Sequence, residues 1–277
     1  MSIEKRIDRQ ELNIKELNLE QPQAGVEFDP KRDVSERDWE LLSQTISDNP
    51  AFYGMLAVLR QVRPDKFTHI PVPEGDIFKR RIQGLIDENL WYSVVTEYAG
   101  FKQLFPDKFE PLTFRTAPKL WRKGNEQLAS GDVGPGFLID MRVLFPDRAG
   151  ELSLDKIPTD PWLETLAKGE PINEPLQQVM ADDFSLKLAY FAAFKALLPD
   201  DAKKLKVDCQ TWEIWRSHLK FLLAQGKTKS VDQAGMIRDL AMIAAQEIKI
   251  TEQGLELVMP KKQSETATPP TPEIKNF

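Results

Sequence analysis

Four segments of this sequence end in the same way, with an apolar run that carries one basic residue and then stops at Pro-Asp. The prolines are Pro64, Pro106, Pro146 and Pro199. Counted back from each proline, the eighth, fifth and second positions are apolar, and the fourth is basic. The apolar residues are Leu56, Leu59, Val62, Tyr98, Phe101, Leu104, Leu138, Met141, Leu144, Phe191, Phe194 and Leu197, and the basic ones are Arg60, Lys102, Arg142 and Lys195.

This spacing is typical of the last turns of a helix. Residues three or four positions apart share one helix face, so the eighth, fifth, fourth and first positions before each proline lie together. A cation near the C-terminal end is favoured by the helix dipole. Proline then ends the helix, because its ring excludes the α region for the preceding residue, and the following Asp suits a turn.

Two interpretations of the four endings stay open. The prolines lie 42, 40 and 53 residues apart, and helical-hairpin repeats run about 40–47 residues. Two spacings are close to that length and the third is not, so the segments form either a divergent repeat or four independent helix ends. The third copy follows Gly134-Pro135-Gly136, and Phe137–Phe145 fits a buried strand as well as a helix.

The composition is that of an ordinary globular protein. The 277 residues are 41% hydrophobic and 29% charged, with a formal net charge of −6. Such a mildly acidic chain disfavours nucleic acid as its main partner, because phosphate binding is driven by positive fields. The basic clusters at 79–81, 119–123 and 203–206 are each surrounded by acids, which indicates solvated faces.

Cysteine usage and hydropathy bear on the compartment. The single cysteine, Cys209, excludes an intramolecular disulfide and favours a reducing environment. Residues 1–20 are charged throughout, unlike a secretory signal, and no stretch approaches the roughly 18 apolar residues of a membrane span. We therefore expect a cytoplasmic protein that does not span a membrane.

The N-terminus carries a candidate docking element. Ile3, Ile7, Ile14 and Leu17 share one face of a predicted amphipathic helix, and residues 21–25 form a linker that completes a first unit over residues 1–25. This helix packs back on its own domain, docks on a partner, or stays disordered until it is bound.

The rest of the chain predicts a mainly α protein, a multi-helix globular bundle with a small C-terminal β-hairpin. Expected helices include 36–47, which begins at a capping box, 51–62, 76–104 with a bend left open at Gly100, 118–128, 161–169, 174–198, 209–225 and 231–246. Alternation at 248–250 and 255–259 predicts the hairpin. The body spans 26–259, with a subdivision near 131–160 left open, and the polar tail 260–277 should be disordered.

Reactive groups are few. His69, His218 and Cys209 do not have the spacing of a zinc site, and the last two lie half a turn out of phase on one predicted helix. No phosphate loop, dinucleotide fingerprint or nucleophile elbow occurs. The sequence therefore predicts no catalytic residue, no metal and no cofactor. An enzyme would need an acidic cleft, with Asp140, Asp182 and Glu97 as the candidates.

Tryptophans supply the second candidate docking surface. Trp212, Trp215, Leu219 and Leu222 form a stripe at three- and four-residue spacing, which is most simply core. Aromatic residues are also favoured interface anchors, so Trp212 and Trp215 join the N-terminal stripe as candidate partner-binding residues.

These features together predict a non-enzymatic interaction protein, an adaptor or structural subunit of a larger bacterial or phage assembly. Its partners would be other protein subunits. One alternative is a hydrolase-type enzyme with an acidic cleft. The other is a helical scaffold that binds nucleic acid through one contiguous basic face.

Overall fold

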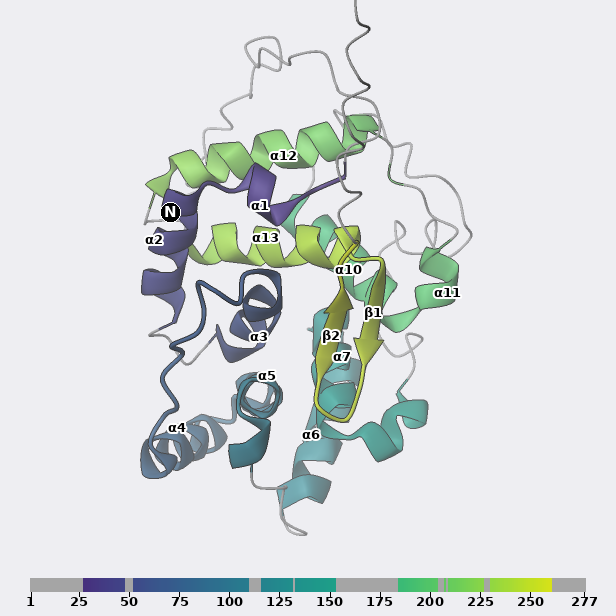
Figure 1. Ribbon diagram of the computed structural model, residues 1–277. Coiled ribbons are helices and arrows are strands. Elements are labelled where there is room, and N and C mark those ends of the chain that lie inside the picture. Colours follow the sequence, from purple (N-terminus) through teal and green to yellow (C-terminus); the bar gives the residue numbers. More distant parts are fainter. Residues whose placement is uncertain are drawn as a thin grey trace, which may run out of the picture.

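The structure is a computed structural model that describes residues 27–47, 52–109, 116–131, 133–152, 184–203, 207, 209–226 and 230–260. Within these residues the protein is mainly helical and carries one two-stranded antiparallel sheet (Figure 1), which confirms the predicted fold class. The predicted N-terminal helix, the predicted helix 161–169, residues 174–183 of the next predicted helix and the predicted tail beyond Pro260 lie outside the described residues.

The elements follow one another in this order: α1 (Pro30–Asp33), α2 (Glu36–Ile46), α3 (Tyr53–Val62), α4 (Gly75–Asp87), α5 (Trp91–Leu104), η3 (Pro106–Lys108), α6 (Thr116–Ser130), α7 (Pro135–Leu144), η4 (Pro146–Glu151), α10 (Phe184–Leu197), α11 (Pro199–Ala202), α12 (Cys209–Ala224), α13 (Ser230–Ala244), β1 (Glu247–Ile250) and β2 (Leu255–Val258).

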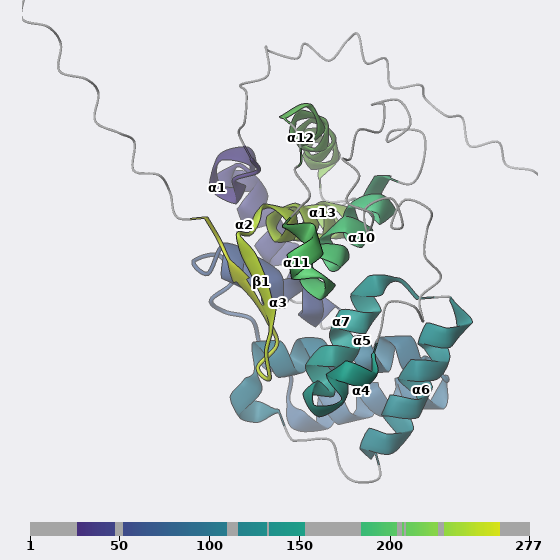
Figure 2. The ribbon, with the colours of Figure 1, turned by 90° about the vertical axis from the view of Figure 1, so that its right-hand side faces the viewer.

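Five of these helices form a closed ring. Helix α3 packs on α5, α5 on α7, α7 on α10, α10 on α13, and α13 returns to α3. Helices α4 and α6 flank α5, whereas α2 and α12 pack on α13. The hairpin lies along one side of the ring, where β2 contacts α3 and β1 contacts α10 and α7 (Figure 2). A ring that closes on itself differs from the open stacking of a helical solenoid.

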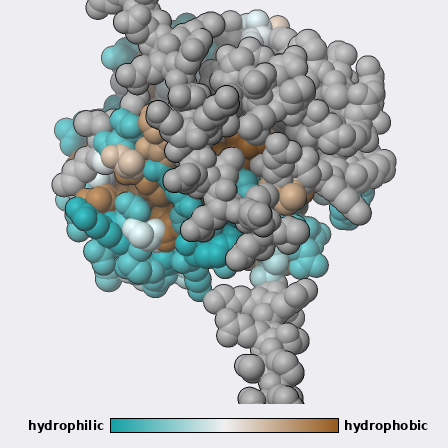
Figure 3. All heavy atoms as spheres, turned by 90° about the horizontal axis from the view of Figure 1, so that it is seen from above, coloured by the Kyte–Doolittle hydropathy of each residue, from teal (hydrophilic) through white to brown (hydrophobic). Residues whose placement is uncertain are grey.

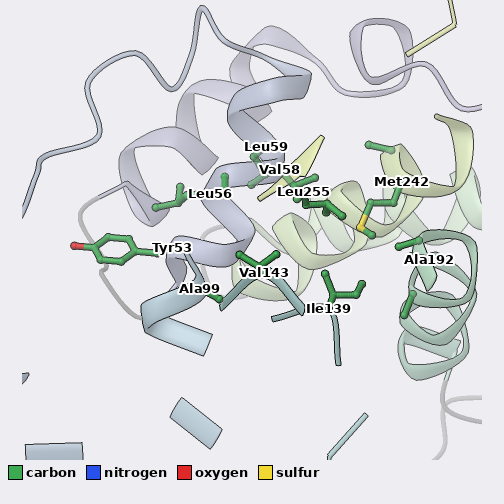
Figure 4. Packing of buried hydrophobic residues seen from close by; sticks show 14 of the residues in the cluster. Tyr53, Leu56, Val58, Leu59, Ala99, Ile139, Val143, Ala192, Met242 and Leu255 are labelled. Carbon is green, nitrogen blue, oxygen red and sulfur yellow. The ribbon is translucent and has the colours of Figure 1, made fainter. Parts of the chain in front are cut away.

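One apolar core connects the ring helices and extends beyond them to α2, α4, α6 and α12. Between the ring helices its residues come from α3, α5, α7, α10, α13 and β2 (Figure 4), among them Leu56, Ala99, Val143, Ala192, Met242 and Leu255. The crossing of α3 and α5 is especially close, because a Cβ added to Gly100 would lie 2.3 Å from the backbone nitrogen of Gly54. Glycine at position 100 therefore lets the two helix backbones meet.

The four Pro-Asp segments end four ring helices, α3, α5, α7 and α10. Residues Phe137–Phe145, left open between helix and strand, thus belong to a helix and its cap. In the first three copies the residue before proline has nearly the same conformation, with φ of −134°, −133° and −125° at Arg63, Phe105 and Phe145. In all four copies its N–H donates to the carbonyl four residues earlier. The segments therefore share local structure as well as sequence.

The basic residue of each segment binds a neighbouring element, and not only the end of its own helix. Arg60 donates to the Leu104 carbonyl at 3.4 Å, Lys102 to the Val143 carbonyl at 2.8 Å, and Arg142 to the Leu152 carbonyl at 3.0 Å. Lys195 donates to the carbonyls of Ile243 and Ala245. Carbonyls at a helix C-terminus lack partners within their helix and carry partial negative charge. Arg60, Lys102 and Lys195 therefore connect one ring helix to another, whereas Arg142 binds the residue that follows η4.

The predicted single helix 76–104 is wrong, because α4 ends at Asp87 and α5 begins at Trp91. Asn89 adopts a left-handed conformation with φ of 61°, which asparagine tolerates better than most residues. Its side-chain oxygen accepts a hydrogen bond of 2.6 Å from the Trp91 indole, which fixes the turn. No proline or glycine marks this break in the sequence.

The predicted hairpin is confirmed, with Ile248 opposite Leu257 and Ile250 opposite Leu255. Two glutamines of the Pro-Asp helices bind the outer edge of β2. Gln61 accepts from the Leu257 N–H at 2.8 Å and donates to the Leu255 carbonyl at 2.5 Å, and Gln103 accepts from the Leu255 N–H at 3.3 Å. Such bonds satisfy edge groups that would otherwise be free to pair with another strand.

Candidate functional site

A pocket of about 300 Å3 lies between the five ring helices. Every ring helix and strand β2 contribute to its wall, through residues that include Val58, Thr96, Asp140, Ala193, Asp239 and Leu255. Its inner wall is therefore part of the apolar core, whereas its polar side chains come from α5, α7, α10 and α13.

Three charged side chains line this pocket. Asp140 lies on α7, one turn after Phe137, and Arg238 and Asp239 are neighbours on α13. Arg238 and Asp239 form an ion pair of 2.8 Å, in which the Asp239 side chain is 7% exposed and that of Arg238 is 31% exposed. Asp140 is partly buried, and the described residues place no cation within ion-pair distance of it.

The surroundings of these groups perturb their protonation. Burial raises the pKa of Asp140 to about 7, although the charge of Arg238 and the Thr96 side chain act in the opposite direction. Burial also raises the pKa of Asp239, against the lowering effect of Arg238. A further positive charge in the pocket would therefore stabilise the ionised form of these carboxylates.

An aromatic rim borders the pocket. Tyr92, which is 47% exposed, lines the pocket and stacks on Phe137, with ring centroids 5.3 Å apart. Leu90, two residues earlier, is 45% exposed. The turn at Asn89 positions both residues, since α5 begins directly after it. Large apolar side chains are also exposed elsewhere, and Figure 3 shows hydrophobic surface among hydrophilic residues on the face seen from above.

The tryptophans predicted as docking residues lie in the core. Trp212 and Trp215 are each 3% exposed, and their rings meet edge to face at 5.1 Å. Trp215 also packs against Phe191 of α10 at 6.1 Å. The pair therefore joins α12 to the ring in this structure. The other four predicted docking residues, Ile3, Ile7, Ile14 and Leu17, lie outside the described residues.

The acids considered for an acidic cleft separate into different roles. Asp140 lines the pocket, but Glu97 is 4% exposed and forms a bidentate pair with Arg81, with two distances of 2.7 Å. Asp182 lies outside the described residues. In the described part of the chain, no three His, Cys, Asp or Glu side chains are grouped as a metal site would require.

Members of each predicted basic cluster are engaged with neighbouring groups. Arg81 binds Glu97, Lys123 binds Glu126 at 2.6 Å, and Lys203 binds Asp200 at 3.0 Å. Lys119 lies over the Trp91 ring, 4.9 Å from its centroid. These contacts fit the interpretation of the clusters as solvated faces with local acidic partners.

The sequence reasoning missed Arg238, Asp239 and Tyr92. A signal for the first two was present, because Arg238-Asp239 interrupts the apolar run from Met236 to Ala245. Charges inside an apolar run are costly to bury unless they are paired or functional. Asp140 interrupts the run from Phe137 to Leu144 in the same way.

Comparison with known proteins gives no relative. No protein family, no curated protein and no solved structure matches this chain. Among the described residues, no helix is long and apolar enough to cross a membrane.

Proposed function

We propose that this protein is a non-enzymatic interaction module, an adaptor or structural subunit of a larger assembly, which binds other protein subunits. The observation that carries the proposal is the exposed Tyr92, stacked on Phe137 at the rim of a preformed pocket. Tyrosine is enriched among the few residues that contribute most of the binding energy at protein–protein interfaces. Such residues contribute most where they lie in or beside a pocket from which binding excludes water.

The size and rigidity of the site support this proposal. A volume of about 300 Å3 lies at the lower end of the range for small-molecule sites and suits one or two side chains of a partner. The ring helices that build the pocket are fastened by Lys102 and Lys195 through bonds to neighbouring carbonyls. A preformed site reduces the ordering cost of association.

The predicted N-terminal helix, with Ile3, Ile7, Ile14 and Leu17 on one face, would add a second docking element. We further propose that the protein works in the cytoplasm, because its single cysteine suits a reducing compartment.

Affinity capture from the organism of origin tests the proposal with matched variants. Tyr92→Ala removes the exposed aromatic ring at the rim of the pocket, and Asp140→Asn removes the negative charge of Asp140. Phe221→Ala removes a side chain of similar exposure, 45%, from α12, away from the pocket. Partners lost with the first two variants and retained with the third support the proposal. Equal capture by all four proteins, or no partner for any, contradicts it.

A second candidate function is acid–base catalysis of the hydrolase type. The observation that favours it is that two carboxylates, those of Asp140 and Asp239, line the same pocket, where burial raises the pKa of Asp140 to about 7. General acids and bases work best when their pKa lies near the operating pH. The two candidate functions predict different results. A partner bound by an adaptor keeps its mass, whereas an enzyme converts its substrate into a product, and Asp140→Asn would abolish that conversion.

A further inference from the structure

The charges that face the pocket do not balance. When Asp140 is ionised, α7 and α13 contribute two carboxylates, those of Asp140 and Asp239, against the single guanidinium of Arg238. That guanidinium is bound to Asp239 at 2.8 Å. From the other ring helices, α5 adds the neutral side chains of Tyr92 and Thr96, α10 adds Tyr190, and α3 adds no titratable group.

An isolated carboxylate in a partly buried site is unfavourable unless a positive charge lies close to it. The charge of Arg238 acts on Asp140, but the guanidinium itself is bound to Asp239, and no described cation forms an ion pair with Asp140. A cation that entered the pocket would meet the carboxylate of Asp140 and the ring of Tyr92 together. Tyrosine faces attract ammonium and guanidinium groups.

We propose that the pocket receives a cationic side chain, arginine or lysine, of a protein partner, with Asp140 as its counter-ion and Tyr92 as its aromatic wall. This inference rests on the proposed interaction function and names the chemistry that the partner presents. An acidic side chain would place a third carboxylate beside Asp140 and Asp239. An uncharged side chain would leave Asp140 with only the charge of Arg238, which is already bound to Asp239.

The protonation of Asp140 gives the proposal a distinct signature. A proton and a cationic ligand compete for the same carboxylate, so bound cation lowers the pKa of Asp140 from its value of about 7. Binding therefore strengthens as pH rises through 7. Below that pH, the affinity falls by up to about tenfold per pH unit, because only the ionised carboxylate pairs with the cation.

The experiment uses the full chain and two blocked amino acids as probes. N-acetyl-arginine-N-methylamide carries a guanidinium, and N-acetyl-citrulline-N-methylamide is its neutral isostere. The carboxyl carbon resonance of Asp140 is followed by NMR from about pH 5 to about pH 9 with each probe. Asp140→Asn is compared with Asp107→Asn, an exposed acid outside the pocket, and amide spectra confirm that both variants are folded.

The arginine probe is expected to lower the pKa of Asp140 saturably, and to shift amide resonances around the pocket more strongly at pH 8 than at pH 6. The citrulline probe should do neither, and Asp140→Asn but not Asp107→Asn should remove the response. An equal response to both probes, or an unchanged pKa of Asp140 up to the solubility limit of the arginine probe, overturns the proposal.

The two hypotheses fail in distinguishable ways. Partner capture that depends on Tyr92 and Asp140, without a response to the arginine probe, would retain the interaction module and refute the cationic ligand. A selective response to arginine with no captured partner would instead refute the interaction module.

Discussion

The bonds between ring helices give the sharpest prediction about stability. Lys102 of α5 donates to the carbonyl of Val143, near the C-terminal end of α7, at 2.8 Å. Lys102→Met keeps an unbranched apolar stem and removes the donor and its charge, together with the contact of the ammonium with the Phe109 ring at 5.8 Å. Val143 itself is fully buried, so its carbonyl has little access to water as a substitute partner.

The expected loss follows from two opposing terms. A hydrogen bond from a charged donor contributes about 1.5–3 kcal/mol net. Burial lowers the pKa of Lys102, which shows that desolvation of its ammonium offsets part of this gain. We therefore expect Lys102→Met to reduce the free energy of unfolding by about 1–2 kcal/mol.

Urea unfolding at pH 7, followed by tryptophan fluorescence and far-UV circular dichroism, measures this loss. Lys108→Met is the control, because Lys108 is exposed and lies six residues away on η3. It should change the free energy of unfolding by less than about 0.5 kcal/mol. If Lys102→Met lies within that same limit, the cation contributes nothing to holding α5 and α7 together, and the reasoning is wrong.

Three further predictions concern the same ring. Burial lowers the pKa of Lys195 to about 8, below the unfolded value of 10.5. Between these pH values the unfolded chain therefore binds the proton more tightly than the native protein does. In urea titrations, the free energy of unfolding of the wild type, minus that of Lys195→Met, should rise from about pH 8 to about pH 10.5. Burial raises the pKa of Asp140 from 3.8 to about 7, so the native state binds the proton more tightly than the unfolded chain does. The free energy of unfolding of the wild type, minus that of Asp140→Asn, should therefore fall as pH rises from about 4 to about 7. A difference that stays constant across this pH range would contradict the burial of Asp140. Gly100→Ala should destabilise the protein by about 2 kcal/mol or more, because the new Cβ meets the α3 backbone. Gly84→Ala, in open space on α4, should stabilise the protein by about 0.5–1 kcal/mol. Equal thermal melting temperatures for the two variants would refute the close crossing of α3 and α5.

Local signals in the sequence predict most helix ends. A proline two residues after Val62, Leu104, Leu144 and Leu197 ends four helices by a mechanism that needs no tertiary information. The partners of the basic residues were not predictable in this way. Lys102 binds a carbonyl 41 residues further along the chain, and the sequence does not state which helices are neighbours.

The break between α4 and α5 was missed for a related reason. Asparagine is only a weak helix breaker, so Asn89 alone does not indicate a turn. The turn is stabilised by the hydrogen bond to Trp91 and by the packing of both helices. Tertiary contacts thus decide a position where local propensity is nearly neutral.

The candidate site was only partly predictable. Asp140 was one of the acids named as candidates for a cleft, but its neighbours Arg238 and Tyr92 lie 98 and 48 residues away in the sequence. Trp212 and Trp215 illustrate the converse, because the stripe that suggested an anchor also suits a core, and burial alone separates the two. Closure of the ring, which no local pattern encodes, creates the pocket.

Site-specific photo-crosslinking tests the central claim most directly. A benzophenone amino acid replaces Leu90, beside Tyr92 at the rim of the pocket, in one protein and Phe221 on α12 in another, and each is irradiated in cells of the organism of origin. The account predicts one dominant protein adduct at position 90, lost when Asp140→Asn is added, and only background at position 221. Equal adducts at both positions, or an adduct at 221 alone, would contradict it.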